Sequence, residues 1–107
     1  ELGGKSPVFL DASLDDAMLD AAVREILETK LHKTGQFCCA HDYALVHEGV
    51  FPRFCEKFEA AVQAAGERRN VAIIARRQYE ALRRKLDESG AACLPALGGR
   101  FVPDDEA

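Results

Sequence analysis

The sequence predicts an α/β fold in which parallel β-strands alternate with helices. Two observations lead to this prediction: short apolar runs alternate with longer segments of helical periodicity, and those segments are long enough to serve as crossover connections. The chain has 107 residues, of which 48% are apolar and 30% charged, a composition suited to one modest core. It contains no internal repeat and no low-complexity linker. We therefore expect residues 1–107 to form one domain, or one piece of a domain.

The first strand and the first helix are predicted from an apolar run followed by a periodic segment. Ser6–Asp11 follows the turn signal Gly3-Gly4 and predicts a short buried strand. Ser13 is the expected N-cap of the helix, with Asp16 as its capping-box partner, and Gly35 is expected to end the helix. One helical face collects the apolar residues Leu19, Val23, Ile26, Leu27 and Leu31.

The second strand is predicted at Tyr43–His47, with a turn at Glu48-Gly49. Pro52 suits the first turn of the helix that follows, and Gly66 is expected to end it. Four residues recur at helical spacing within this second helix: Phe54, Phe58, Val62 and Ala65.

The last third of the sequence predicts one more helix and a weaker strand. Val71–Ile74 is either a brief strand or an entry segment. A third helix is expected over Arg76–Glu88, with Gly90 as its stop. Cys93–Leu97 is a weak strand interrupted by Pro95, which favours an edge position. The helix carries three larger residues on one side: Tyr79, Leu82 and Leu86.

Charge and cysteine content narrow the classes of function. The formal net charge is −4, which argues against a general nucleic-acid-binding protein. Its arginines stand among acidic residues, which is typical of a solvated helix face. No signal-peptide pattern or membrane-length apolar run is visible, so we expect free thiols in a reducing, cytoplasmic setting. The four cysteines are Cys38, Cys39, Cys55 and Cys93.

The segment KTGQFCCAHDY, residues 33–43, leaves three interpretations open for its adjacent cysteines. A metal site is not expected, because structural zinc sites usually draw two ligand pairs from two separate motifs. Burial is what composition alone favours for Cys38 and Cys39, and it is favoured more strongly for Cys55 and Cys93. A nucleophile would need an accessible polar setting and an N–H donor aimed at the oxyanion. Gly35 would let the chain bend tightly before such a cysteine.

Two motifs together resemble the paired active-site segments of the aldehyde dehydrogenase superfamily. ELGGKSP, residues 1–7, is similar to the segment that the family's glutamate opens, and GQFCCA, residues 35–40, is similar to its nucleophile motif. CCAHDYALV looks like the class-3 and fatty aldehyde dehydrogenase branch. IIARRQYEAL at residues 73–82 and Gly98–Phe101 also have counterparts there. The resemblance implies that this chain is part of an aldehyde dehydrogenase-like catalytic domain.

The resemblance also implies roles for individual residues. Cys38 matches the nucleophile that forms a thiohemiacetal and then a thioester, and Glu1 matches the general base that activates water. Leu2 and Gly3 match positions beside the nicotinamide of NAD or NADP. The backbone N–H of Cys38 would be half of the oxyanion hole, while Cys39 would have no catalytic role. No metal is implied, because a thiolate nucleophile needs none.

Two positions and the chain length differ from the family pattern. Lys33 stands where the family often has Asn, and His41 stands where this branch has Pro. Both ends look like cuts, and the cofactor domain and oligomerisation arm are not in this stretch. We therefore expect a segment of a longer homo-oligomeric enzyme that acts on an aldehyde and is inactive alone. The alternative is a non-catalytic remnant that serves as an interaction or oligomerisation module.

Overall fold

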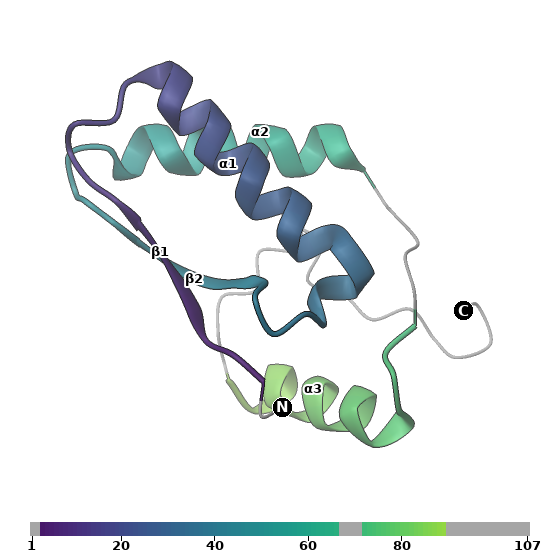
Figure 1. Ribbon diagram of the computed structural model, residues 1–107. Coiled ribbons are helices and arrows are strands. Elements are labelled where there is room, and N and C mark those ends of the chain that lie inside the picture. Colours follow the sequence, from purple (N-terminus) through teal and green to yellow (C-terminus); the bar gives the residue numbers. More distant parts are fainter. Residues whose placement is uncertain (1–2, 67–71, 90–107) are drawn as a thin grey trace. The chain divides into compact units, whose positions relative to one another are not determined.

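The computed structural model describes residues 3–66 and 72–89, and the chain divides into two compact units, Glu1–Ala72 and Ile73–Ala107 (Figure 1). The elements of the first unit follow the predicted alternation of strand and helix, and the second unit contains one described helix. In chain order they are β1 (Ser6–Leu10), α1 (Asp16–Leu31), the short 3₁₀ helix η1 (His32–Gly35), β2 (His41–Val46), α2 (Phe51–Ala65) and α3 (Arg76–Ser89).

The two described strands pair in parallel, which confirms the predicted α/β arrangement. Ser6 lies opposite His41, and the register continues from Pro7 opposite Tyr43. Between these two pairs, Asp42 is an extra residue in β2, so the ladder has a bulge. Pro7 lacks an N–H to donate to the partner strand, which is the physical reason that pairing is interrupted there.

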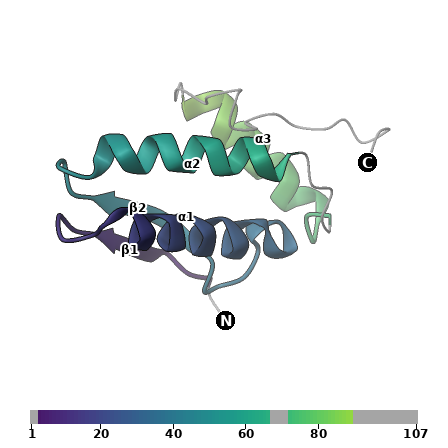
Figure 2. The same ribbon diagram turned by 90° about the horizontal axis from the view of Figure 1, so that it is seen from above.

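The core lies between the strands and the two helices of the first unit. α1 contacts both β2 and α2, and the two helices cross at an angle in Figure 1 and lie next to each other in Figure 2. The predicted apolar face of α1 is confirmed, since its middle residues are buried. The buried apolar residues of the described chain are Leu10, Leu19, Val23, Ile26, Ala40 and Val50.

Two ion pairs join the exposed edges of the helices. Arg53 Nη1 lies 2.9 Å from Asp16 Oδ1, and Lys57 Nζ lies 2.8 Å from Asp20 Oδ1. The hydrogen bond from Lys57 to Asp20 raises the pKa of Lys57 above 10.5. Exposed pairs of this kind contribute little to stability, because solvent screens the charges and the long side chains lose conformational freedom.

The predicted start of α1 was wrong, because the N-cap is Asp15 and not Ser13. The Asp15 carboxylate accepts a hydrogen bond from the backbone N–H of Met18 at 2.8 Å. Ser13 is instead engaged by Asp11, whose carboxylate accepts hydrogen bonds from the Ser13 N–H, at 2.8 Å, and from its hydroxyl. The local turn around Asp11 therefore uses Ser13 before the helix begins.

The predicted end of α1 at Gly35 also differs, because the helix ends at Leu31. Lys33, Thr34 and Gly35 follow in η1 with φ values of 45°, 61° and 70°, which is left-handed backbone. At Gly35 a Cβ atom would lie 3.1 Å from the Lys30 carbonyl oxygen, and the φ of 70° would strain a side chain there, so glycine is favoured. Three left-handed residues in succession turn the chain away from the helix axis toward the cysteines.

The remaining elements follow the predictions with small shifts. β2 begins at His41 and ends at Val46, whereas Tyr43–His47 was expected. α2 begins at Phe51 with Pro52 in its first turn and is capped by Gly66, as predicted. None of its described side chains is fully buried, and its Phe54 and Phe58 rings lie 5.6 Å apart.

The predicted third helix is confirmed over Arg76–Ser89. Of its larger residues, Tyr79 and Leu86 are half-buried and Leu82 is exposed. Residues 72–74 form neither helix nor strand. Val71, the Gly90 stop and the Cys93–Leu97 strand fall outside the described residues.

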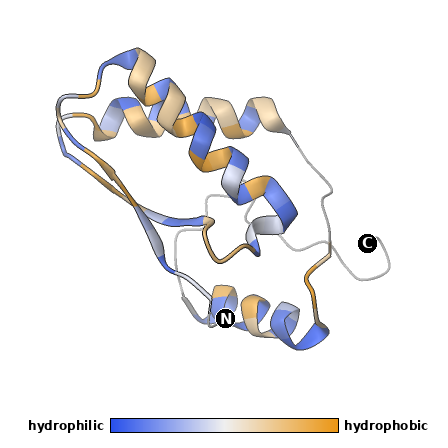
Figure 3. Ribbon diagram, in the orientation of Figure 1, coloured by the Kyte–Doolittle hydropathy of each residue, from blue (hydrophilic) through white to orange (hydrophobic). Residues whose placement is uncertain are grey.

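Apolar and polar residues separate along the strands. The carboxyl ends of β1 and β2 are apolar, whereas β2 begins with polar residues (Figure 3). Phe9, Tyr43 and Leu45 are 72%, 48% and 50% exposed, so one face of the sheet is open. Among the described helices, none has the length and apolarity to cross a membrane.

Candidate active site

The two sequence motifs meet at the amino ends of the parallel strands. Gly4, just before β1, lies against the backbone of Cys38, just before β2. A Cβ atom built on Gly4 would overlap the Cys38 carbonyl oxygen and would lie 3.0 Å from its carbonyl carbon. Only glycine therefore allows this approach. Sequence reasoning assigned roles to Leu2 and Gly3 and missed Gly4, although parallel pairing of the two predicted strands pointed to it.

Cys38 and Cys39 are the central residues of a tight turn. The backbone N–H of Ala40 donates to the Phe37 carbonyl at 3.1 Å, which closes the turn around the two cysteines. Both cysteines are exposed, so the burial favoured by composition was wrong. Burial was favoured more strongly for Cys55, and this prediction was also wrong, because Cys55 is exposed on α2. Cys93 lies outside the described part of the chain.

The turn leaves a backbone donor available at the proposed nucleophile. Within the described part of the chain, the N–H of Cys38 donates to no other backbone group. This is the usual state of the second residue in a β-turn, whose N–H points away from the closing hydrogen bond. An N–H on the same residue as the thiol can stabilise an oxyanion that forms next to the sulfur.

Gln36 anchors the turn from the side of η1. Its side-chain Nε2 donates to the Lys33 carbonyl at 3.0 Å and to the Ala72 carbonyl at 3.1 Å. The glutamine of the GQFC motif therefore joins the left-handed segment to the chain that follows α2. Its amide thereby links two carbonyls that are distant in the sequence and holds the chain that leads to Cys38.

His41 and Asp42 anchor the turn from the side of β2. Thr29 Oγ1 donates to the Ile26 carbonyl at 3.0 Å and forms a second hydrogen bond with His41 Nδ1 at 3.1 Å. The Asp42 carboxylate lies 3.4 Å from Lys5 Nζ and 3.9 Å from Lys30 Nζ. These contacts tie the first residues of β2 to α1 and to the residue before β1.

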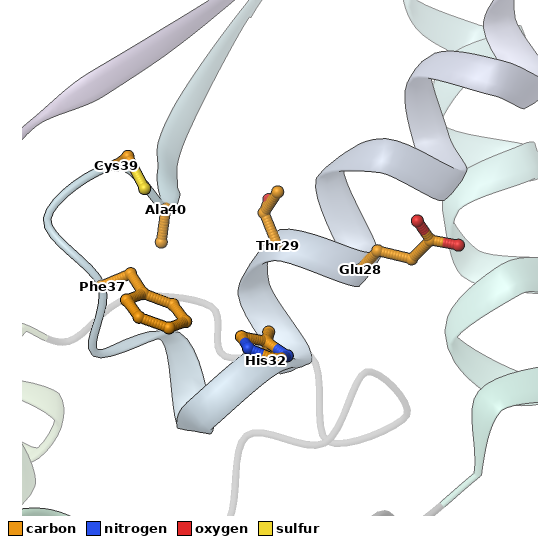
Figure 4. Close-up of a pocket in the computed structure, with 6 residues that line it drawn as sticks. All are labelled: Glu28, Thr29, His32, Phe37, Cys39 and Ala40. Carbon is orange, nitrogen blue, oxygen red and sulfur yellow. The ribbon is translucent and has the colours of Figure 1, made fainter.

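A pocket of about 280 Å³ opens beside the turn (Figure 4). One wall carries Cys39 and Ala40, and the other carries the end of α1. The His32 and Phe37 rings are stacked at 5.0 Å with an angle of 9° between their planes. In Figure 4 the Cys39 side chain points toward this pocket, while the Glu28 carboxylate is turned away from it. The lining residues are Glu28, Thr29, His32, Phe37, Cys39 and Ala40.

The other predicted site residues are only partly described. Glu1 and Leu2 fall outside the described residues. Gly3 has φ of 87°, and nothing lies within 4 Å of the position of its missing Cβ. In the described residues, no three His, Cys, Asp or Glu side chains gather as a metal site would require.

Comparison with known proteins identifies relatives of this arrangement. The pattern described as the aldehyde dehydrogenase family matches residues 1–106. A mitochondrial succinate-semialdehyde dehydrogenase of Arabidopsis thaliana is 41% identical over 63 residues, which cover 59% of this chain and 11% of that protein. A fatty aldehyde dehydrogenase of Saccharomyces cerevisiae is 32% identical over 62 residues, covering 58% of this chain and 12% of that protein.

A third relative has the same family name and a longer overlap. The lactaldehyde dehydrogenase of Escherichia coli is 32% identical over 78 residues, covering 68% of this chain and 16% of that protein. The chain therefore spans between 11% and 16% of the length of these three relatives. No solved structure gives a significant match.

Proposed function

This chain belongs to the aldehyde dehydrogenase family, and on that premise we propose that it supplies the nucleophile turn of an NAD- or NADP-dependent aldehyde dehydrogenase. The complete protein oxidises an aldehyde to a carboxylic acid through an intermediate on Cys38. The observation that carries this proposal is the contact between Gly4 and Cys38. It joins the two motifs whose pairing is characteristic of the family.

The first step is addition of the Cys38 thiolate to the carbonyl carbon of the aldehyde. The carbonyl electron pair moves to oxygen, and the Cys38 N–H donates to that oxygen in the thiohemiacetal. The N–H donor and the sulfur both belong to Cys38, so the turn that positions this residue positions both groups together. The proposal is supported by the exposure of Cys38 and by the donor that its turn leaves available.

The second step removes hydride from the thiohemiacetal carbon and leaves a thioester on Cys38. NAD or NADP supplies the hydride acceptor when it is bound, and the open backbone at Gly3 fits its approach. Glu1 then takes a proton from water, which attacks the thioester carbon and releases the acid and the thiol. Cys38 is thereby returned to its starting state.

The decisive experiment compares cysteine variants of the natural protein that carries this sequence. Cys38→Ser is expected to lower aldehyde-dependent reduction of NAD or NADP by at least about a thousandfold. Cys55→Ser is the matched control, because Cys55 is an exposed cysteine on α2. Equal activity of the two variants would show that Cys38 is not the nucleophile.

The finer assignments are also proposals. The fatty aldehyde dehydrogenase relative supports the class-3 and fatty aldehyde branch, while the succinate-semialdehyde relative supports an aldehyde with a second carboxylate. We propose a homo-oligomeric protein of the reducing cytoplasm. The 107 residues alone are proposed to be inactive, and an assay of this chain beside the natural protein tests that.

An interaction module is the second candidate, favoured by the open face of the sheet. Phe9, Tyr43 and Leu45 expose apolar surface there, and parallel sheets are usually covered on both faces. A second copy of the chain would bury this surface without any chemistry at Cys38. Sedimentation of this chain tests the idea: a monomer at every concentration contradicts it, and a dimer lost in Phe9→Ser supports it.

A further inference from the structure

His41 joins the chain that leaves the cysteine turn to α1. The turn around Cys38 closes at Ala40, and His41 is the next residue. The Nδ1 atom of its ring lies 3.1 Å from Thr29 Oγ1 on α1. From this contact we propose that His41 is a positioning residue for Cys38, which acts through Thr29 to hold the turn in the geometry that the reaction needs. This inference rests on the function proposed for Cys38.

The regular pairing of the sheet does not extend to His41. Ser6 lies opposite His41, but the bulge at Asp42 separates this pair from the pairs that start with Pro7 and Tyr43. A bulge leaves its extra residue unpaired and disrupts the ladder locally. The end of the turn is therefore joined to the sheet by one isolated pair, and the side-chain contact with Thr29 restricts it further.

Thr29 is a fixed partner, because its hydroxyl is also bonded within α1. Thr29 Oγ1 donates to the carbonyl of the buried Ile26 at 3.0 Å. Both Thr29 and His41 are half-buried, so water competes less for their hydrogen bond than it does at an exposed site. The bond thereby connects the cysteine turn to the core through one side chain of α1.

The ion pairs of the neighbouring Asp42 are weaker restraints on the turn. The Asp42 carboxylate lies 3.4 Å from Lys5 Nζ and 3.9 Å from Lys30 Nζ, and the Lys5 side chain is exposed. Solvent screens such pairs, and the long lysine side chains lose conformational freedom in forming them. Of the two anchors at the start of β2, the shorter and half-buried contact of His41 is therefore the stronger.

His41 acts on the reaction indirectly. Among the described residues, no hydrogen bond joins its ring to the sulfur of Cys38 or Cys39. A displacement of about 1 Å at a reacting group can lower a rate about a hundredfold, so a residue that touches neither substrate nor sulfur still affects catalysis. The branch pattern that the sequence resembles has proline at this position, and proline has no side-chain group that bonds to Thr29.

The first test compares histidine variants of the natural protein that carries this sequence. His41→Leu cannot form the hydrogen bond, and we expect it to lower kcat for aldehyde oxidation by about tenfold with KM changed by less than about twofold. His41→Asn places an amide near the position of Nδ1 and is expected to retain kcat within about threefold. His47→Leu is the matched control. His47 follows the other end of β2, where its Nδ1 accepts from the Gly49 N–H at 3.0 Å, and its loss should change kcat by less than about twofold.

Variants of Thr29 test the partner on α1. Thr29→Val removes the hydroxyl and keeps the shape, so it should lower kcat about as much as His41→Leu, whereas Thr29→Ser should retain kcat. Because both changes break the same bond, the double variant should lose no more than about twofold beyond either single variant. Losses that multiply would show that the two residues act independently and would overturn the inference. If His41→Leu does not fold, the comparison of Thr29→Val with Thr29→Ser decides the question.

Thiol labelling separates a positioning role from a loss of folding. At a temperature at which circular dichroism shows each variant to be folded, iodoacetamide modification of Cys38 and Cys55 is followed by peptide mass spectrometry. We expect His41→Leu to change the ratio of the Cys38 rate to the Cys55 rate by at least about threefold. His41→Asn should leave this ratio unchanged within about twofold.

The outcomes separate the inference from the function on which it rests. If His41→Leu lowers only the melting temperature and leaves kcat and the labelling ratio unchanged, the contact is purely structural and the inference is overturned. Aldehyde oxidation that is lost in Cys38→Ser would still stand in that case. If no aldehyde is oxidised by the protein with Cys38 intact, both the function and the inference are overturned.

Discussion

The core between α1, α2 and the strands is stabilised by the burial of apolar side chains. The amino end of the sheet is instead stabilised by individual polar contacts and by the close approach that one glycine allows. In the core, Leu19 is 0% exposed and Val50 is 1% exposed, and neither needs a specific partner. At the amino end, both cysteines are exposed, and the turn depends on Gln36, His41 and Asp42. The difference shows that the core and the proposed nucleophile turn are stabilised by different kinds of interaction.

Such a division has a thermodynamic reason. Burial of an apolar side chain contributes about 1.5–3 kcal/mol without directional requirements, so a core tolerates some variation in shape. A reacting thiol needs access to substrate and cannot be buried in the same way. The turn must then be positioned by hydrogen bonds and tight backbone contacts, each of which contributes about 1 kcal/mol or less.

The largest effect is expected from the core side of this comparison. Leu19→Ala should lower the free energy of unfolding by about 2.7–5 kcal/mol, because it removes a fully buried side chain and leaves a cavity. Urea denaturation followed by far-ultraviolet circular dichroism measures it. The neighbouring Met18→Ala, at a residue 53% exposed, is the control and should change stability by less than about 1 kcal/mol. Equal losses of unfolding free energy in the two variants would contradict the proposed difference between core and surface.

A second effect is expected where the two motifs touch. Gly4→Ala should lower the free energy of unfolding by about 1–3 kcal/mol, because the new methyl group collides with the Cys38 carbonyl. It should also change the rate at which a thiol reagent labels Cys38, measured by peptide mass spectrometry. Gly3→Ala is the control, since that site has open space and carries only the cost of its φ of 87°, about 1–2 kcal/mol. An unchanged Cys38 labelling rate in Gly4→Ala would argue against the contact.

A smaller effect of opposite sign is expected in the left-handed segment. Thr34 is β-branched and has φ of 61°, a conformation that asparagine adopts at lower cost. Thr34→Asn should therefore raise the free energy of unfolding by about 0.5–1 kcal/mol, which thermal denaturation would detect. The same change at Thr29, inside α1 and bonded to His41, should lower stability. A gain at both positions would mean that backbone strain is not the cause.

The smallest effect is expected at the opposite end of β1. The hydrogen bonds from the hydroxyl and the N–H of Ser13 lower the pKa of Asp11 below 3.8. A lowered folded-state pKa contributes stability that is present above pH 3.8 and is lost as pH falls through the folded-state value. Ser13→Ala should move the pKa of Asp11 toward 3.8, measured by a nuclear magnetic resonance titration of its carboxyl carbon. No movement would show that the hydroxyl bond is not formed in solution.

The core could be predicted from the sequence because it depends on periodicity. The spacing of Leu19, Val23 and Ile26 specifies one helical face whatever lies opposite, and the apolar run after Ser6 specifies a strand. The start of α1 was harder to predict. Ser13 and Asp15 are both good caps, and only the competing bonds to Asp11 decide between them.

The site could be predicted only in part, because it depends on contacts between distant residues. The motif pair identified Cys38, and its roles with Glu1, Leu2 and Gly3 stay predictions. Composition wrongly favoured burial of the cysteines, because residue averages carry no information about a turn at the surface. Three further features were not predicted: the Gly4 contact, the Gln36 bonds and the stacked rings of the pocket.

The contact between Gly4 and Cys38 also sets the order in which the unit can assemble. All of β1 and α1 separates the two residues, so the contact is non-local and requires closure of a loop of about thirty residues. As the chain leaves the ribosome, Gly4 emerges well before the turn with which it packs. Until that loop closes, both cysteines lie in a segment that has not yet packed against Gly4. Because both thiols stay exposed after the loop closes, folding sets the geometry of the turn and does not shield its sulfur atoms.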